Sequence, residues 1–202
     1  ALAVASQLSP AARAIGAANT LTRDGSGWRA DNTDAPGFLA ALDMAGASRL
    51  EGRRVLVLGA GGSARAVVHA LAGSGAAVTI LNRTPERAEA LSQELTEGEA
   101  AHGPFDPTPA KWADIVVNTT SRGHTGDRFD VPDGDGRLFF DLSYGAPAEA
   151  QLDHARTRGW TTRDGLSMLV AQAAESFNIW FDIRPDMASA LALCRATVEM
   201  KS

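Results

Sequence analysis

The sequence is poor in several residue types, and each scarcity removes a class of protein from consideration. Its 202 residues include a single cysteine, Cys194, which can form neither an internal disulfide nor a cysteine metal cluster and suits a reducing cytoplasm. The four histidines show no metal-ligand spacing, so no metal site is expected. No apolar run approaches about 20 residues, so no membrane span is expected. The formal net charge of −5, with no basic block among aromatics, argues against a nucleic-acid partner.

The composition that remains is typical of a globular chain. With 45% hydrophobic and 21% charged residues, the chain can build one full core and a small second one. Ala1 is not an initiator methionine, and the basic start of a signal peptide is absent. We therefore expect a cytoplasmic protein whose sequence is entered midway.

An apolar run followed by closely spaced glycines predicts a nucleotide-binding turn. Residues 55–58 have the pattern of a buried parallel strand, and the turn and helix start follow as Gly59, Ala60, Gly61, Gly62, Ser63 and Ala64. Gly59 lets the chain reverse sharply, and Gly61 lacks the side chain that would hold a pyrophosphate away from the helix N-terminus. A small residue such as Ala64 lets the helix lie close to the sheet. Such a turn by itself is weak evidence, because glycine-rich turns occur in many loops.

The residues after the second strand of this unit indicate the cofactor. An NAD enzyme usually places Asp or Glu there for the ribose hydroxyls, whereas this chain has Asn82, Arg83 and Thr84, with Arg87 one helical turn further on. An amide and a guanidinium can hydrogen-bond a 2′-phosphate that a carboxylate would repel, which favours NADP. Thr84 and the proline after it are also a helix-capping pattern, and both interpretations can hold together.

The order of predicted elements indicates an α/β fold, with a Rossmann-type parallel sheet, helices on both faces of the sheet, and a remnant of a second α/β domain. Strands are expected at 54–58, 77–81, near 100, 115–118, 138–141 and 160–163, and helices between them at 63–73, 85–95 and 147–158. Outside this alternation we expect a helix within 1–15, a hairpin at 17–31, and helices at 34–45, 167–182 and 186–199.

Seven short motifs, in order along nearly the whole chain, resemble the shikimate dehydrogenase family. They are residues 16–20 (GAANT), 31–34 (DNTD), the turn at 59–64, 82–84 (NRT), 118–121 (NTTS), 141–144 (DLSY) and 164–172 (DGLSMLVAQ). The resemblance implies NADPH-dependent, reversible reduction of 3-dehydroshikimate to shikimate in aromatic amino acid biosynthesis. It also implies three parts: residues 1–33 as the remnant of a substrate domain, 34–165 as the NADP-binding domain, and 166–202 as helices returning toward the substrate domain.

The same resemblance assigns roles to single residues. Asp34 matches the family's catalytic aspartate, which pairs with a lysine to move the proton, and it also borders the substrate. Asn19, Gln172 and Tyr144 match residues that contact the substrate. Thr120, Ser121, Gly165 and Met168 match residues around the cofactor's ribose and nicotinamide.

Each of these assignments has a structural alternative. Asp34 could be the first-turn acid of a helix, and Asn19 could pair within a turn. Gln172 could be a solvated helix position, and Tyr144 could be a buried phenol with a satisfied hydroxyl.

The sequence also departs from the family pattern. We expect most of the N-terminal substrate domain to be missing, with its serine-rich carboxylate site and the motif that bears the lysine. The only lysines, Lys111 and Lys201, match no such motif. Smaller departures are Ala35 and Ser167 in place of glycines and His124 where methionine is usual.

These departures leave two other functions open: a truncated module that binds NADP without turnover, and a dehydrogenase that acts on quinate. We expect the isolated chain to bind NADP with little turnover. Trp180 and Phe181 are expected in the core of the last helices. The apolar faces of 17–31 and 167–199 would be exposed without a substrate sheet, and we expect self-association or local disorder there. A homodimer is one arrangement left open.

Overall fold

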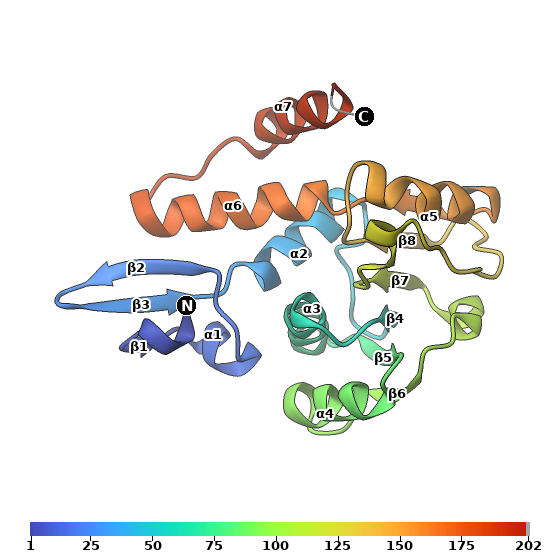
Figure 1. Ribbon diagram of the computed structural model, residues 1–202, viewed down its shortest axis with the longest axis horizontal. Helices are drawn as coiled ribbons and strands as arrows, with labels where there is room; N and C mark the ends of the chain where they lie inside the picture. The colour runs from blue at the N-terminus through green and yellow to red at the C-terminus, as the bar shows by residue number, and fades with distance from the viewer. Residues whose placement is uncertain (201–202) are drawn as a thin grey trace.

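The computed structural model describes residues 1–200, which form two β-sheets and a set of flanking helices (Figure 1). The strands are β1 (Gln7–Leu8), β2 (Thr20–Asp24), β3 (Gly27–Asp31), β4 (Arg54–Leu58), β5 (Ala77–Asn82), β6 (Ala101–Pro104), β7 (Ile115–Asn118), β8 (Leu138–Asp141) and β9 (Thr161–Arg163). The α-helices are α1 (Pro10–Ile15), α2 (Asp34–Met44), α3 (Gly62–Gly73), α4 (Pro85–Thr96), α5 (Ala146–Thr157), α6 (Leu166–Phe181) and α7 (Met187–Glu199). Short 3-10 turns are η1 (Leu2–Val4), η2 (Thr108–Trp112) and η3 (Arg122–Thr125).

The larger sheet is parallel throughout and confirms the predicted Rossmann-type architecture. Its six strands have the order β6-β5-β4-β7-β8-β9, so the chain first builds outward from β4 to β6 and then resumes on the other side of β4. Val55 of β4 is paired with Val78 on one side and with Ile115 on the other. Ligands of such sheets bind at the carboxyl ends of the strands where this order reverses, which here is the edge at β4, β5 and β7.

Helices cover both faces of the sheet, as the alternating pattern predicted. Because successive strand residues point to opposite faces, Val55 and Val57 lie in one buried cluster with α2, α3 and α4, whereas Leu56 and Leu58 lie in a second cluster with α5. The second cluster is rich in aromatics, and its Phe139 contacts Trp160. Two continuous cores therefore hold the strands rigidly under the functional edge.

The N-terminal segment contains the helix expected within residues 1–15 as α1, which begins at Pro10, but a strand that was not expected precedes it. Gln7–Leu8 pair in parallel with β3, and the small sheet has the order β1-β3-β2. Ser9 then caps α1 by accepting a hydrogen bond from the backbone N–H of Ala12. The helical propensity of the alanine-rich start is overridden because pairing with the hairpin satisfies the backbone of residues 6–9.

Helices α2 and α6 cross between the two sheets and carry the polar residues of the site. A Cβ at Gly37 of α2 would lie only 2.8 Å from the backbone nitrogen of Gln172 of α6, so the glycine permits this close approach. The close packing of α2 and α6 holds Gln172 next to the beginning of α2.

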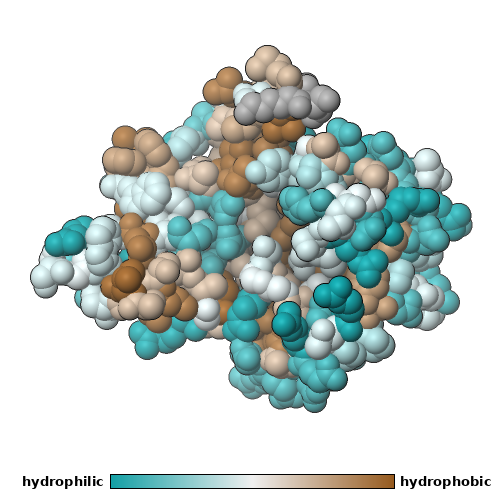
Figure 2. All heavy atoms as spheres, viewed as in Figure 1, coloured by the Kyte–Doolittle hydropathy of each residue, from teal (hydrophilic) through white to brown (hydrophobic). Residues whose placement is uncertain are grey.

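The end of α6 exposes apolar side chains, contrary to the core position expected for Trp180 and Phe181. The exposed fractions are 50% for Trp180 and 58% for Phe181, and Ile183 beyond them is 57% exposed. Figure 2 shows brown, apolar surface at this end of α6 and around α7. The indole N–H of Trp180 nevertheless donates to the carbonyl of Leu21, so the helix is tied to β2.

Within the described residues, no helix is both long enough and apolar enough to cross a membrane. The same part of the chain contains no cluster of three metal-binding side chains.

Candidate active site

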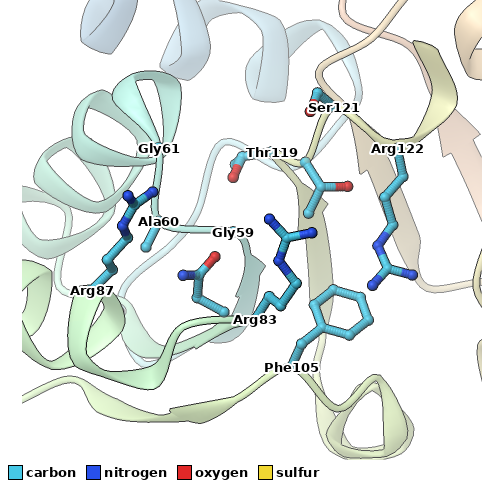
Figure 3. Close-up of a pocket in the computed structure, with 11 residues that line it drawn as sticks. Gly59, Ala60, Gly61, Arg83, Arg87, Phe105, Thr119, Ser121 and Arg122 are labelled. Carbon is cyan, nitrogen blue, oxygen red and sulfur yellow. The ribbon is translucent and has the colours of Figure 1, made fainter. Parts of the chain in front are cut away.

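A cavity of about 230 Å³ lies at the carboxyl edge of the sheet, where the strand order reverses. Its lining comes from the chain following four neighbouring strands, and comprises Gly59, Ala60, Gly61, Asn82, Arg83, Arg87, Phe105, Thr119, Thr120, Ser121 and Arg122 (Figure 3). Eight of these eleven residues were predicted from the sequence to contact the cofactor. We call this cavity the nucleotide pocket.

The two glycines of the turn are required for different reasons. Gly59 has φ of 111°, and a Cβ there would lie 2.4 Å from Oγ1 of Thr119, whose hydroxyl donates to the carbonyl of Leu58. The fold itself therefore demands glycine at position 59. Gly61 has φ of −93°, and a Cβ there would meet nothing within 4 Å, so the space beside it is open to a ligand.

The turn leads directly into the N-terminus of α3. Gly61 is its N-cap residue, and the backbone N–H groups of Gly62, Ser63 and Ala64 lack intrahelical acceptors, as in the first turn of any helix. Ala64 is fully buried, which agrees with the expected need for a small residue between helix and sheet. The N–H groups and the helix dipole suit a pyrophosphate at this point.

Three arginines line the nucleotide pocket: Arg83, Arg87 and Arg122. Among the side chains that the structure describes, none of their guanidinium groups forms an ion pair or a hydrogen bond, although the whole chain carries a net charge of −5. Arg83 and Arg87 both belong to the segment that follows β5, where the sequence predicted a 2′-phosphate site. Unpaired guanidinium groups at this place are suited to phosphate oxygens.

The capping alternative for Thr84 is correct in part. Thr84 is the N-cap residue of α4 and Pro85 occupies the first turn, but the Thr84 side chain makes no capping hydrogen bond. The side-chain amide of Asn82 donates to the Thr84 carbonyl at 2.9 Å and so fixes the turn that presents Arg83. Thr84 does not line the nucleotide pocket.

A second cavity adjoins the first and shares residues 119–121 with it. It is also lined by Ser63, His124, Leu142, Ser143, Tyr144 and Pro147. Tyr144 is 41% exposed, which contradicts the alternative of a buried phenol. The two adjoining cavities together extend from the arginines to Tyr144, and we call them the groove.

Asn118 and Asp141 accept hydrogen bonds from the backbone of the loops that line this groove. They were not predicted as site residues. Burial, the largest cause, raises the pKa of the Asp141 carboxyl, against the hydrogen bonds from Asn118 and Ser143 that lower it. Both residues end strands within motifs that the sequence showed, and a polar residue at the end of a buried strand was the available signal.

Asn19, Asp34 and Gln172 come together from three separate segments of the chain. The side-chain nitrogen of Asn19 lies 2.9 Å from Oδ1 of Asp34 and 3.3 Å from Oε1 of Gln172. Burial raises the pKa of the Asp34 carboxyl, and the hydrogen bond from Asn19 lowers it by less. A half-buried carboxyl with a raised pKa beside two amides is typical of a site that exchanges protons with a bound ligand.

A layer of hydroxyl groups holds the Asn19 side chain in place and was missed in the sequence. Oδ1 of Asn19 accepts hydrogen bonds from the backbone N–H of Thr33 and from the hydroxyl of Thr20. The hydroxyl of Ser176 lies 2.7 Å from that of Thr20 and 3.1 Å from that of Thr33. Ser176 is one helical turn beyond Gln172, and this spacing on α6 was the signal that could have identified it.

Gly165 and Met168 line neither cavity. A Cβ at Gly165 would lie 1.9 Å from the carbonyl oxygen of Leu142, so glycine is required there for packing. Met168 is 7% exposed and belongs to the buried cluster under α2 and α3. Their predicted contact with the nicotinamide stays a prediction.

Lys111 does not lie beside Asp34. The ammonium of Lys111 lies 4.1 Å from the ring centroid of Trp112, at the end of η2. Lys201 lies outside the described residues. Within the described part of the chain, Asp34 forms hydrogen bonds to amides and no ion pair.

A parallel sheet of this order, a glycine turn before a helix N-terminus and unpaired arginines after the next strand define a dinucleotide-binding protein of the Rossmann class. The family model "Shikimate / quinate 5-dehydrogenase" matches residues 41–154, and the model "Shikimate 5'-dehydrogenase C-terminal domain" matches residues 165–194. The chain belongs to the shikimate dehydrogenase family, as its motifs predicted.

Individual relatives agree with this assignment. The shikimate dehydrogenase (NADP(+)) of Hyphomonas neptunium is 50% identical over 100% of this chain and 75% of its own length. The protein of the same name from Xanthomonas euvesicatoria is 42% identical over 97% of this chain and 72% of its own length.

Solved structures show the same fold. Shikimate 5-dehydrogenase of Thermus thermophilus, in complex with NADP(H) and shikimate, superposes with a TM-score of 0.81 at 32% identity, covering 96% of this chain and 74% of that one. A 5-ketofructose reductase of a Gluconobacter strain also superposes with a TM-score of 0.81 at 32% identity, covering 100% of this chain and 74% of that one.

Proposed function

We propose that this chain binds NADP and serves the interconversion of 3-dehydroshikimate and shikimate in aromatic amino acid biosynthesis. The observation that carries the proposal is the meeting of Asn19, Asp34 and Gln172, which are up to 153 positions apart in the sequence. Such a polar cluster, together with a nucleotide pocket, is what oxidation of a secondary alcohol needs from a protein.

The residues present fit NADP. The open space beside Gly61 and the free N–H groups of α3 would receive the pyrophosphate, and Arg83 and Arg87 would hold the 2′-phosphate. Thr120 and Ser121 border the path from the turn toward Tyr144, where the nicotinamide half would lie. When bound, the nicotinamide supplies or accepts the hydride.

Asp34 would move the proton. Its raised pKa allows the carboxyl group to exchange a proton with a substrate hydroxyl nearer to neutral pH than an exposed aspartate could. The amides of Asn19 and Gln172 would orient the substrate's hydroxyls, and Tyr144 would border the substrate from the groove. Because an amide rather than a cation accompanies Asp34 in the described structure, we expect slow turnover from this chain alone.

We propose a division of the chain into domains that follows the two sheets. Residues 1–33, with the small sheet, would belong to the substrate domain, and residues 34–165 would form the NADP domain. Residues 166–202 would return toward the substrate domain, which is supported by the tie between Trp180 of α6 and Leu21 of β2.

The location of the protein and its oligomeric state are also proposals. We propose the cytoplasm as the location, for which the single free cysteine is the support. We also propose self-association of this chain into a homodimer, supported by the exposed apolar end of α6.

A titration tests the proposed function directly. NADP+ and NAD+ are each titrated into the 202-residue chain by calorimetry, and shikimate or quinate is then added while the absorbance of the reduced nicotinamide is followed. We expect NADP+ to bind more tightly than NAD+ and shikimate to be oxidised slowly. Preference for NAD+, or oxidation of quinate but not of shikimate, would contradict the proposal.

A further inference from the structure

Phe105 and Arg122 form a wall of the nucleotide pocket that the sequence did not indicate. Phe105 follows β6 and Arg122 opens η3 after β7, and the guanidinium carbon of Arg122 lies 4.5 Å from the centroid of the Phe105 ring. This distance is that of a cation–π contact, which holds the planar group against the ring. Two segments far apart in the sequence thus close one side of the pocket (Figure 3).

The wall is anchored in the core. The Phe105 ring packs edge-on against Phe129, with 5.3 Å between centroids and 82° between the ring planes. Phe129 is 7% exposed, and its backbone N–H and C=O are both bound by the side-chain amide of Gln151. Phe105 is therefore a fixed support on which the guanidinium of Arg122 rests, and both residues are half-buried.

The other two arginines lie elsewhere in the pocket. Figure 3 shows Arg87 beside Ala60 and Gly61, whereas Arg122 stands on the opposite side, next to Phe105. Arg83 lies between them and extends into the middle of the pocket. The three cations thus do not converge on one point, and Arg122 faces a different part of the ligand from Arg87.

The geometry points to an adenine subsite: we propose that the adenine of the bound dinucleotide stacks on the guanidinium plane of Arg122, with Phe105 behind it. The inference rests on the proposed binding of NADP. With the pyrophosphate at the start of α3 and the ribose 2′-phosphate at Arg83 and Arg87, the base extends away from α3, toward the chain that follows β6 and β7. A planar guanidinium is a suitable face for a purine, and this stack adds affinity without discriminating between NADP and NAD.

Substitutions at position 122 separate stacking from phosphate binding. Arg122→Lys keeps the charge and loses the planar face, whereas Arg122→Tyr keeps a planar face and loses the charge. For a stack, we expect Arg122→Lys and Arg122→Ala each to weaken NADP+ binding roughly tenfold, and Arg122→Tyr to bind within about threefold of the unsubstituted chain. The dissociation constants are measured by calorimetry on the 202-residue chain.

A support variant and a charge control complete the test. Phe105→Leu is expected to weaken NADP+ binding severalfold, and thermal unfolding of each variant verifies that it is folded. Arg49→Ala, which removes a charge from a separate cavity, is expected to leave the affinity unchanged. Retained binding in Arg122→Lys with lost binding in Arg122→Tyr would overturn the stack in favour of a phosphate contact, and unchanged binding in Arg122→Ala would overturn the subsite. Absence of NADP+ binding by the unsubstituted chain would instead contradict the proposed function.

Discussion

The side-chain amide of Asn118 donates a hydrogen bond of 2.7 Å to Oδ2 of Asp141, and both side chains are buried. The two residues are register partners at the carboxyl ends of β7 and β8. Oδ1 of Asn118 accepts from the backbone N–H of Thr120, and Oδ1 of Asp141 accepts from that of Ser143. One buried pair therefore shapes both loops that line the second cavity.

Removal of the Asp141 carboxylate should be costly. Asp141→Ala leaves the Asn118 amide and the Ser143 N–H without acceptors, and we expect it to lower the free energy of unfolding by about 1–3 kcal/mol or more. Urea denaturation measures the change. Glu89→Ala, at an exposed position of α4, is the control and should stay within about 0.5 kcal/mol. Equal stability of the two variants would show that the pair is not structural.

We expect alanine to affect mainly folding at Gly59 and mainly NADP+ binding at Gly61. Gly59→Ala forces a side chain into positive φ and against Thr119, so we expect it to lower the free energy of unfolding by about 1–3 kcal/mol. Gly61→Ala places its Cβ in open space and should lower the free energy of unfolding by less than about 1 kcal/mol. The same Cβ should weaken NADP+ binding, because it occupies the space open to the ligand. Denaturation and calorimetry on both variants check this, and unimpaired NADP+ binding by Gly61→Ala would argue against a pyrophosphate at the turn.

We expect the contribution of Asp34 to the free energy of unfolding to decrease as pH rises. Because burial raises its pKa in the folded chain, the native state keeps its proton to a higher pH than the unfolded state does. The stabilising contribution of the protonated group is complete below the unfolded pKa of about 3.9 and is lost as pH rises through the folded value.

The substitution Asp34→Asn tests the direction of this pH dependence. We expect the free energy of unfolding of the variant, relative to the unsubstituted chain, to increase from about pH 4 to about pH 7, as measured by urea denaturation across that range. Asp43→Asn, at the exposed end of the same helix, is the matched control for loss of a carboxylate. A relative stability that decreases over this range would contradict the burial effect.

Arg83 and Arg87 should decide the choice of cofactor. Replacing both by alanine removes the charge-assisted hydrogen bonds to a 2′-phosphate, so we expect NADP+ binding to weaken roughly 10- to 100-fold and NAD+ binding to change little. Calorimetric titration of both dinucleotides gives the ratio of affinities. An equal loss for both would place these arginines at a part of the ligand that the two cofactors share.

The exposed end of α6 should mediate self-association. Phe181→Ser combined with Ile183→Ser removes two side chains that are each more than half exposed, and we expect it to shift a homodimer toward monomer. Light scattering over a range of concentrations measures the shift. Trp180 is left intact because it is bonded to β2, and a monomeric unsubstituted chain would refute the expected association.

Local sequence patterns predicted most of the residues that line the nucleotide pocket. The apolar run at 55–58, the glycines after it and the arginines after β5 lie within about 30 residues, and a βαβ unit folds these into one place by its own geometry. The helix expected within residues 1–15 is present as α1, but the strand at Gln7–Leu8 was missed because its pairing with β3 depends on residues about 20 positions away. Phe105 and Arg122 gave no signal, since their contact depends on the relative placement of two loops.

The sequence by itself thus determined the parallel sheet, the turn and, through its motifs, the family, because these depend on periodicity and on residues close together along the chain. Only the tertiary structure decided that the Asn19 amide is hydrogen-bonded to both Asp34 and Gln172, that burial raises the pKa of Asp34, and that Arg122 rests on Phe105. The physical reason is that desolvation and long-range contacts depend on how α2, α6 and the loops pack together, and no local pattern records that packing.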